Sequence, residues 1–246
     1  MKLLCLGTTG YHPNDLRHTA CFMLPEIGVV LDAGTGMYRV RDHLVTPHLH
    51  IFITHAHVDH IMGLTFLYDV LNDRPVSRAN VYGEAEKLAA IREHLFSEPL
   101  FPVAPPCDFL PLDGPVTLPG GAKLTHFPVD HPGGAIGYRI DWSDRSMAYV
   151  TDTIANPTAA YVEKIRGVDL LVHECYFADD QTALADLTGH SHITPVAQVA
   201  RAADVGRLLL VHLNPLIAAK DPVGLGEARA IFPAAELGVD HLAIDF

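Results

Sequence analysis

The apolar residues of this chain fall mainly into short runs, a pattern that predicts β-strands. We expect strands at residues 3–6, 21–24, 29–31, 50–53, 124–129, 135–140, 147–150, 169–172, 208–211 and 241–244. The early strands follow one another closely, whereas the later ones alternate with helical segments. This order predicts two sheets packed face to face with helices outside, so the fold class is α/β (α+β).

Helical periodicity and capping residues lie between several of the runs. The predicted helical segments include Leu64, Leu67, Tyr68 and Leu71, then Leu88, Ile91 and Leu95. Asn156-Pro157 and Thr194-Pro195 each combine an N-cap residue with proline, and Gly167 is expected to cap a C-terminus. The proline-rich residues 99–106 resemble a long loop rather than a linker. We therefore expect a single domain over residues 1–246.

Composition narrows the class of protein. The 246 residues are 49% apolar and 19% charged, enough for a sizeable core. No apolar run approaches the roughly 20 residues that cross a bilayer, and the N-terminal run resembles a strand rather than a signal peptide. We expect a soluble, cytoplasmic protein with free thiols. The net charge of −12 gives no general attraction to nucleic acids or other polyanions.

Histidine is abundant, with 16 residues, and its grouping indicates metal binding. His55, His57, Asp59 and His60 directly follow the expected strand at 50–53 and precede a predicted helix. Sites in layered α/β folds usually lie at the carboxyl ends of strands. Residues two apart on a tight turn can converge on one ion, while Asp59 and His60 can face a second.

Three further candidates share this context, because each follows an apolar strand. They are His131, Asp152 and His212. Together with the first cluster they supply five histidines and two aspartates. This number of ligands suits two ions that keep a position open for water.

In order and spacing these residues resemble the motifs of the metallo-β-lactamase fold hydrolases. The resemblance implies a four-layer αββα sandwich and a dinuclear site, with two divalent ions per chain. It implies that His55, His57 and His131 hold one ion, that Asp59, His60 and His212 hold the other, and that Asp152 bridges them. Zinc is the expected metal, with manganese or iron as alternatives for these nitrogen and oxygen ligands.

Two more motifs are similar to those of ribonuclease Z. The segment from His173 to Phe177 resembles its His-Glu-Ala-Thr motif, with Cys175 and Tyr176 in place of Ala-Thr. His190-Ser191-His192 resembles its His-Ser-Thr motif. That family carries a long tRNA-binding arm between the positions of His131 and Asp152, where this chain has only 20 residues. This departure argues against tRNA as the substrate.

The favoured function is therefore a metal-dependent phosphodiesterase in which a metal-bridging hydroxide attacks small or short diesters. Asp59 orients the nucleophile, and His190, held by Glu174, protonates the leaving group. One alternative is hydrolysis of a lactone, thioester or other carbonyl ester at the same metals. Another is a redox or non-catalytic metal-binding protein. A homodimer is compatible with the sequence, and no membrane partner is expected.

Overall fold

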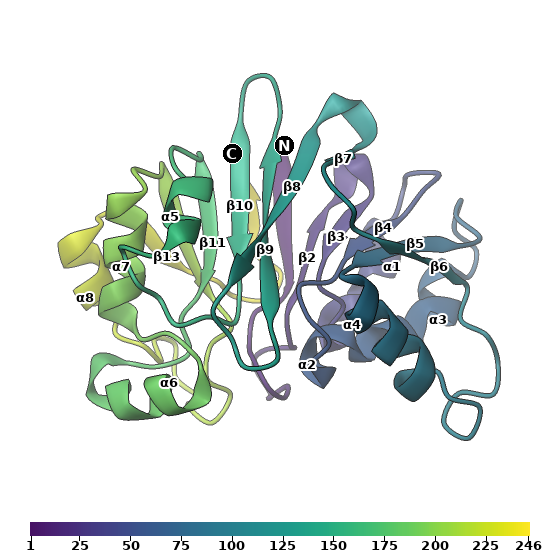
Figure 1. The fold of residues 1–246 in the computed structure, drawn as a ribbon, viewed down its shortest axis with the longest axis horizontal. Coiled ribbons are helices and arrows are strands. Elements are labelled where there is room, and N and C mark those ends of the chain that lie inside the picture. The colour runs from purple at the N-terminus through teal and green to yellow at the C-terminus, as the bar shows by residue number, and fades with distance from the viewer. The chain divides into compact units, whose positions relative to one another are not determined.

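The computed structural model describes residues 1–246, which form two compact units. The first unit comprises Met1–Gly114 and Asp240–Asp245, and the second comprises Pro115–Val239 and Phe246. Each unit contains a seven-stranded mixed sheet. Figure 1 shows the strands together with the helices. The two predicted sheets are thus confirmed. None of the helices is long and apolar enough to cross a membrane.

The sheet of the first unit has the order β14-β1-β2-β3-β4-β5-β6. Strands β14, β1, β2 and β3 pair antiparallel, whereas β3 to β6 pair in parallel. The carboxyl ends of the parallel strands therefore share one edge, and the histidine motif follows β4 there. The strands are β1 (Lys2–Gly7), β2 (Cys21–Leu24), β3 (Val29–Leu31), β4 (His50–Phe52), β5 (Ala79–Gly83), β6 (Cys107–Pro111) and β14 (Ala243–Asp245).

The helices of the first unit cover one face of this sheet. Ile51 and Val81 on the strands and Leu64, Leu67 and Leu88 on the helical segments belong to one buried core. Burying each such side chain stabilises the fold by about 1.5–3 kcal/mol. The helices are α1 (Val40–His43), α2 (Val58–Ile61), α3 (Leu67–Leu71) and α4 (Ala85–Ala90), with a 3-10 turn η3 (Met62–Phe66) and a π-helical turn η4 (Ile91–Leu95).

The sheet of the second unit has the order β13-β12-β11-β10-β9-β8-β7. Strands β7 to β10 pair antiparallel, and β10 to β13 pair in parallel. The expected short hairpin without an arm is present, because β9 turns directly into β10. The strands are β7 (Val116–Thr117), β8 (Lys123–Val129), β9 (Ala135–Asp141), β10 (Ser146–Val150), β11 (Leu170–Glu174), β12 (Arg207–Val211) and β13 (Ala235–Leu237).

Helices of the second unit pack on its sheet through an aliphatic core. Val150, Leu171 and Leu210 of the strands and Val196 and Val199 of α7 are fully buried members of this core. Their burial holds the parallel strands in register, so that residues at the strand ends take fixed positions. The helices are α5 (Ala160–Lys164), α6 (Thr182–Thr188), α7 (Ile193–Ala202) and α8 (Leu225–Ile231).

Two predicted helix starts were wrong by a few residues. The helix expected from Asn156-Pro157 begins at Ala160, because the Asn156 side chain instead accepts the Thr158 amide and forms a turn. The helix expected from Thr194-Pro195 begins at Ile193. Gly167 does not cap α5 directly; it lies in the turn that leads to β11, with φ +66°.

Candidate metal-binding residues in each unit

The first unit gathers three histidines after β4: His55 and His57 lie in the loop before α2, and His60 lies in α2 itself. His55 and His60 are buried, whereas His57 is exposed. The His55 ring centroid lies 4.5 Å from that of His57 and 4.3 Å from that of His60. The short turn after β4 thus brings the imidazoles together, as the spacing of the motif predicts.

Asp59 belongs to the same cluster. Its Oδ2 lies 3.3 Å from Nε2 of His60, and its side chain is 10% exposed. The same oxygen accepts the backbone N–H of Tyr11 at 2.8 Å. A carboxylate held at a fixed position beside an imidazole is a typical part of a hydrolytic metal site.

Asp32 orients the two buried histidines, a role that the sequence analysis missed. Its Oδ2 accepts Nδ1–H of His60 at 2.9 Å, and both of its oxygens accept the Thr54 hydroxyl. The Thr54 hydroxyl oxygen in turn lies 3.0 Å from Nδ1 of His55. With Nδ1 engaged on both rings, Nε2 is the atom that can bind metal, an arrangement common around metal-ligating histidines. The sequence feature that could have indicated this role is an aspartate directly after the predicted strand at 29–31.

The second unit brings His131, Asp152 and His212 together. Nε2 of His131 lies 3.7 Å from one Asp152 oxygen, and Nε2 of His212 lies 3.2 Å from the other. Nδ1–H of His131 donates to the Gly189 carbonyl at 2.9 Å, so Nε2 of this ring also faces the cluster. All three side chains are about 2% exposed, which fits ligands that are shielded from bulk water.

Glu174 and His190 lie in the second unit as well, and they interact directly. Nδ1–H of His190 donates to Oε1 of Glu174 at 3.1 Å. The fully buried Glu174 carboxylate also accepts the backbone N–H groups of Thr153 and Ser191, at 2.8 and 3.2 Å. Nitrogen or oxygen atoms of His190, Asp152 and His212 all lie within 4.8 Å of one another. The predicted His190–Glu174 contact is therefore present beside two candidate ligands.

The donor atoms in both units fit divalent metal ions. They are imidazole nitrogens and carboxylate oxygens, a set that suits zinc and also manganese or iron. Thiolates do not compete for the role, because burial raises the pKa of every cysteine and all four are free thiols. The chain can thus bind divalent metal through these histidines and aspartates.

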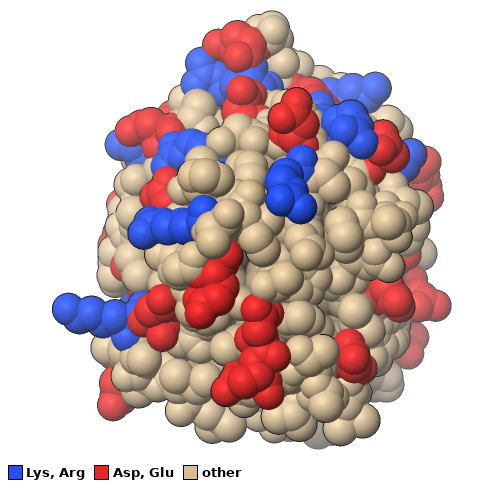
Figure 2. All heavy atoms as spheres, turned by 90° about the vertical axis from the view of Figure 1, so that its left-hand side faces the viewer, with Lys and Arg blue, Asp and Glu red and all other residues tan.

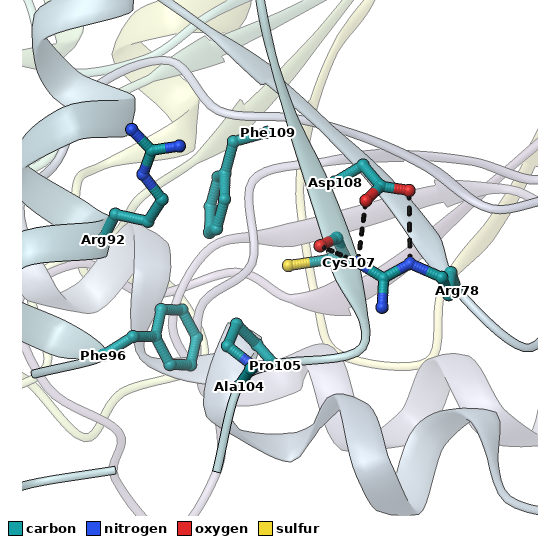
Figure 3. A pocket seen from close by; sticks show the side chains of 8 residues that line it. All are labelled: Arg78, Arg92, Phe96, Ala104, Pro105, Cys107, Asp108 and Phe109. Carbon is teal, nitrogen blue, oxygen red and sulfur yellow. Dashed lines mark hydrogen bonds and ion pairs between the residues drawn. The ribbon is translucent and has the colours of Figure 1, made fainter. Parts of the chain in front are cut away.

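The first unit also has an open pocket of about 510 Å³ that the candidate metal ligands do not line. Figure 3 shows Arg78 paired with the carboxylate of Asp108, while Phe96 and Phe109 line the apolar side. Arg78 precedes β5 and Cys107 begins β6, so the pocket lies at the amino ends of these strands. The histidine motif follows the carboxyl end of the parallel strand β4. The pocket is therefore separate from the candidate metal ligands.

Comparison with known proteins identifies the family. Residues 28–213 match the β-lactamase superfamily domain. Ribonuclease Z of Gloeothece citriformis is 30% identical over 304 aligned positions, which cover 98% of this chain and 94% of that protein. The chain belongs to the ribonuclease Z family of the β-lactamase superfamily. Because the alignment has more positions than the 246 residues of this chain, this ribonuclease Z has residues without a counterpart here.

Solved structures support the same fold for this ribonuclease Z family member. The metallo-β-lactamase fold protein YhfI from Bacillus subtilis aligns with a TM-score of 0.80 at 19% identity, over 99% of each chain. The short form of human tRNase Z aligns with a TM-score of 0.76 at 19% identity, over 100% of this chain and 99% of that one. The predicted metallo-β-lactamase fold is thus confirmed.

Proposed function

We propose that this ribonuclease Z family member hydrolyses phosphodiester bonds in small molecules or short RNA, and that it processes tRNA precursors poorly. Its ribonuclease Z relatives indicate a hydrolase, a metal-dependent phosphodiesterase. The observation that carries the proposal is the hydrogen bond between His190 and Glu174 beside Asp152 and His212. A thioester hydrolase has no comparable need for a proton donor at this position, because a thiolate leaves without a proton.

The metal ligands follow from the family resemblance. We assign His55, His57 and His131 to one ion, Asp59, His60 and His212 to the other, and Asp152 to both. Zinc is the preferred metal. Two such ions, when bound, make water nucleophilic near neutral pH and neutralise charge on the phosphoryl oxygens. The clustering of these histidines and aspartates within each unit supports a role for them in metal binding.

The chain's own residues supply the proton transfers. Asp59, which the Tyr11 amide holds in place, orients the nucleophile and accepts its proton. Glu174 engages Nδ1 of His190, so Nε2 is the ring atom that gives a proton to the departing alkoxide. Three hydrogen bonds fix the Glu174 carboxylate, two from backbone amides and one from His190. A fixed carboxylate keeps the imidazole in one orientation during the reaction.

The β9–β10 hairpin and the surface charge of the second unit both favour a small substrate. Strands β9 and β10 pair from Ser146 to Tyr149 and join directly, so no arm extends from this position. On the helical face of the second unit, basic and acidic residues are interspersed in the upper part, and mostly acidic residues occur lower down (Figure 2). Such a face gives little grip on a polyanion. We also place the protein in the cytoplasm, and we regard residues 1–246 as one functional domain because the family match spans both units.

Metal analysis and a substrate panel test the proposal. Protein purified without chelator is expected to contain close to two metal ions per chain by inductively coupled plasma analysis. Turnover of bis-(p-nitrophenyl) phosphate is then compared with that of lactones and thioesters. Activity confined to the carbonyl esters would overturn the phosphodiesterase proposal. Undiminished hydrolysis by metal-free protein would contradict the metal site.

His190→Ala is expected to slow alkyl phosphodiesters by roughly 10²–10⁴, the span of general acid–base catalysis. Nitrophenyl diesters should lose less, because nitrophenolate leaves without a proton. His192→Ala is the matched control, since His192 forms a similar pair with Asp179 at 2.6 Å. Rates of both substrate types are measured for each variant. Equal losses on the two types would assign His190 a binding or structural role.

A further inference from the structure

Tyr176 makes a contact that the proposed mechanism does not use. It follows β11 by two residues and is half-buried. Its ring stacks on that of His190, with centroids 4.9 Å apart and planes 20° from parallel. The ring centroid of His212 lies 5.8 Å from that of Tyr176, at 45°. Tyr176 therefore covers one face of the imidazole that we assign as the proton donor.

Backbone hydrogen bonds fix the position of this ring. The N–H groups of Tyr176 and Phe177 both donate to the carbonyl of Ser191, at 3.1 Å each. The centroid of the buried Phe177 ring lies 4.8 Å from that of the Tyr176 ring, with the planes tilted by 60°. The segment after β11 is thus tied to the segment that carries His190, and the two rings keep their relative position.

The imidazole needs such support. The hydrogen bond to Glu174 restrains His190 at Nδ1, a bond about which the ring plane can rock, and the His212 ring stacks on the imidazole with centroids 5.3 Å apart. The side chain is 16% exposed, so the surrounding protein does not fully enclose it. A stacked aromatic ring restricts this rocking, because aromatic pairs favour a defined offset geometry. Small errors in the position of a catalytic group can slow a reaction severely.

We propose that Tyr176 is a positioning residue that holds the imidazole plane of His190 in the orientation needed to protonate the leaving group. The inference rests on the proposed function. It concerns the aromatic face of Tyr176 and not its hydroxyl. The ribonuclease Z motif that this segment resembles has threonine at this position, a side chain that cannot stack. The aromatic ring of Tyr176 is therefore a feature of this chain that supports the proton donor His190.

Three variants separate the ring from the hydroxyl. Tyr176→Phe keeps the stack and should keep alkyl diester turnover within about twofold. Tyr176→Leu and Tyr176→Thr remove it and should lower kcat on alkyl diesters about tenfold, with KM and nitrophenyl diester turnover nearly unchanged. Tyr38→Leu is the control, because Tyr38 packs on a histidine away from these residues, His18, at 5.1 Å. It should leave both rates unaltered.

A double-mutant cycle shows whether Tyr176 acts through His190. In the His190→Ala background, Tyr176→Leu should cause no further loss, because the group that it positions is absent. An additional tenfold loss in that background would overturn the inference. So would equal losses with Tyr176→Phe and Tyr176→Leu, or equal losses on both substrate types.

An NMR measurement tests the stack independently of activity. The imidazole Cε1–H signal of His190, assigned by its disappearance in His190→Ala, should be displaced by the ring current of Tyr176. Tyr176→Phe should keep this displacement, and Tyr176→Leu should remove it. An unchanged signal in Tyr176→Leu would overturn the inference even if the protein hydrolyses diesters. Conversely, absent diester hydrolysis with the displacement present would contradict the proposed function while the stack stands.

Discussion

Three of the seven non-glycine residues with a positive φ are candidate metal ligands or a residue that supports them. Asp32, Asp152 and His212 have φ angles of +56°, +37° and +54°, in the left-handed region that side chains other than glycine rarely adopt. Each such residue costs on the order of 1–3 kcal/mol, so the surrounding contacts must compensate. Asp32 shows how, because it accepts the amide and hydroxyl of Thr54 and Nδ1–H of His60. Such strain is typical of functional sites, where the direction of a side chain is maintained at the cost of an unfavourable backbone conformation.

The cysteines are expected to be inert in the folded protein. Burial raises the pKa of the Cys5 and Cys107 thiols to about 12. A raised pKa means that thiolate forms only near that pH, so at pH 8 both remain protonated and unreactive. All four cysteines are buried, and Ellman's reagent should therefore label none of them rapidly in native protein at pH 8. All four should react in denaturant. Fast labelling of the native protein would contradict this burial.

At the scale of elements, the end of helix α6 links two parts of the second unit's site. Gly189 follows the helix with φ +75°, and its N–H donates to the Ala185 carbonyl. Its own carbonyl accepts Nδ1–H of His131, and the next residue is His190. One helix terminus thus orients a candidate ligand and carries the proposed acid. Glycine is favoured here because the left-handed conformation disfavours a side chain and the close approach of Pro132 leaves no room for one.

Gly189→Ala is expected to disturb both functions. The added Cβ would lie 2.3 Å from Cδ of Pro132, at a φ where alanine is strained. We expect a loss of about 1–3 kcal/mol in the free energy of unfolding. Metal affinity should fall about tenfold, since His131 loses its orienting carbonyl. Urea denaturation and competition with a chelator measure the two effects.

Gly167→Ala provides the matched control for this substitution. Gly167 has a similar φ of +66°, but an added Cβ there meets no atom within 4 Å. The control therefore carries the backbone strain without the clash, and it should leave metal affinity unchanged. Equal metal affinity in the two variants would show that Gly189 does not position His131.

Strands that are continuous apolar runs were predictable from the sequence. Strands that depend on pairing with a neighbouring strand were not. Strands such as β2 and β10 are continuous apolar runs, and both were predicted. Strands β5 and β6 were missed, because Ala79–Gly83 alternates only weakly and Cys107–Pro111 is largely exposed and ends in proline. Each is defined by its parallel neighbour rather than by its own residues.

The same distinction applies to the site. The cluster from His55 to His60 is local in sequence, so its convergence was predictable. The hydrogen bond from His60 to Asp32 joins residues 28 positions apart, and that from His131 to Gly189 joins residues 58 apart. The α7 start was misplaced for a related reason. Asp179, 15 residues before Thr194, accepts both its amide and its hydroxyl, so the capping carboxylate comes from another segment.

At the scale of the whole molecule, charge limits the substrates that the chain can hold. Its 17 Lys and Arg residues are outnumbered by 29 Asp and Glu residues. Several of the arginines are paired with carboxylates, as Arg78 is with Asp108 and Arg166 with Glu163. Such pairs leave fewer cations for phosphate groups. Affinity for nucleic acid rises with the number of phosphates that Lys and Arg neutralise, so binding should be weak and confined to a few contacts.

The enzyme is therefore expected to cleave small or short phosphodiesters and to remove the 3′ trailer of precursor tRNA poorly. Residues 132–151, where the resemblance to ribonuclease Z implies an arm, contain only the hairpin of β9 and β10, and the net charge of −12 supplies no attractive field in place of an arm. Cleavage of a 3′-extended tRNA precursor is measured beside that of a small diester, at the same enzyme and metal concentrations. The small diester should be turned over and the precursor left largely intact. Efficient, site-specific trailer removal would contradict the argument from the missing arm. Light scattering on the same sample would then show whether a homodimer forms, in which a second copy provides the phosphate contacts that one chain lacks.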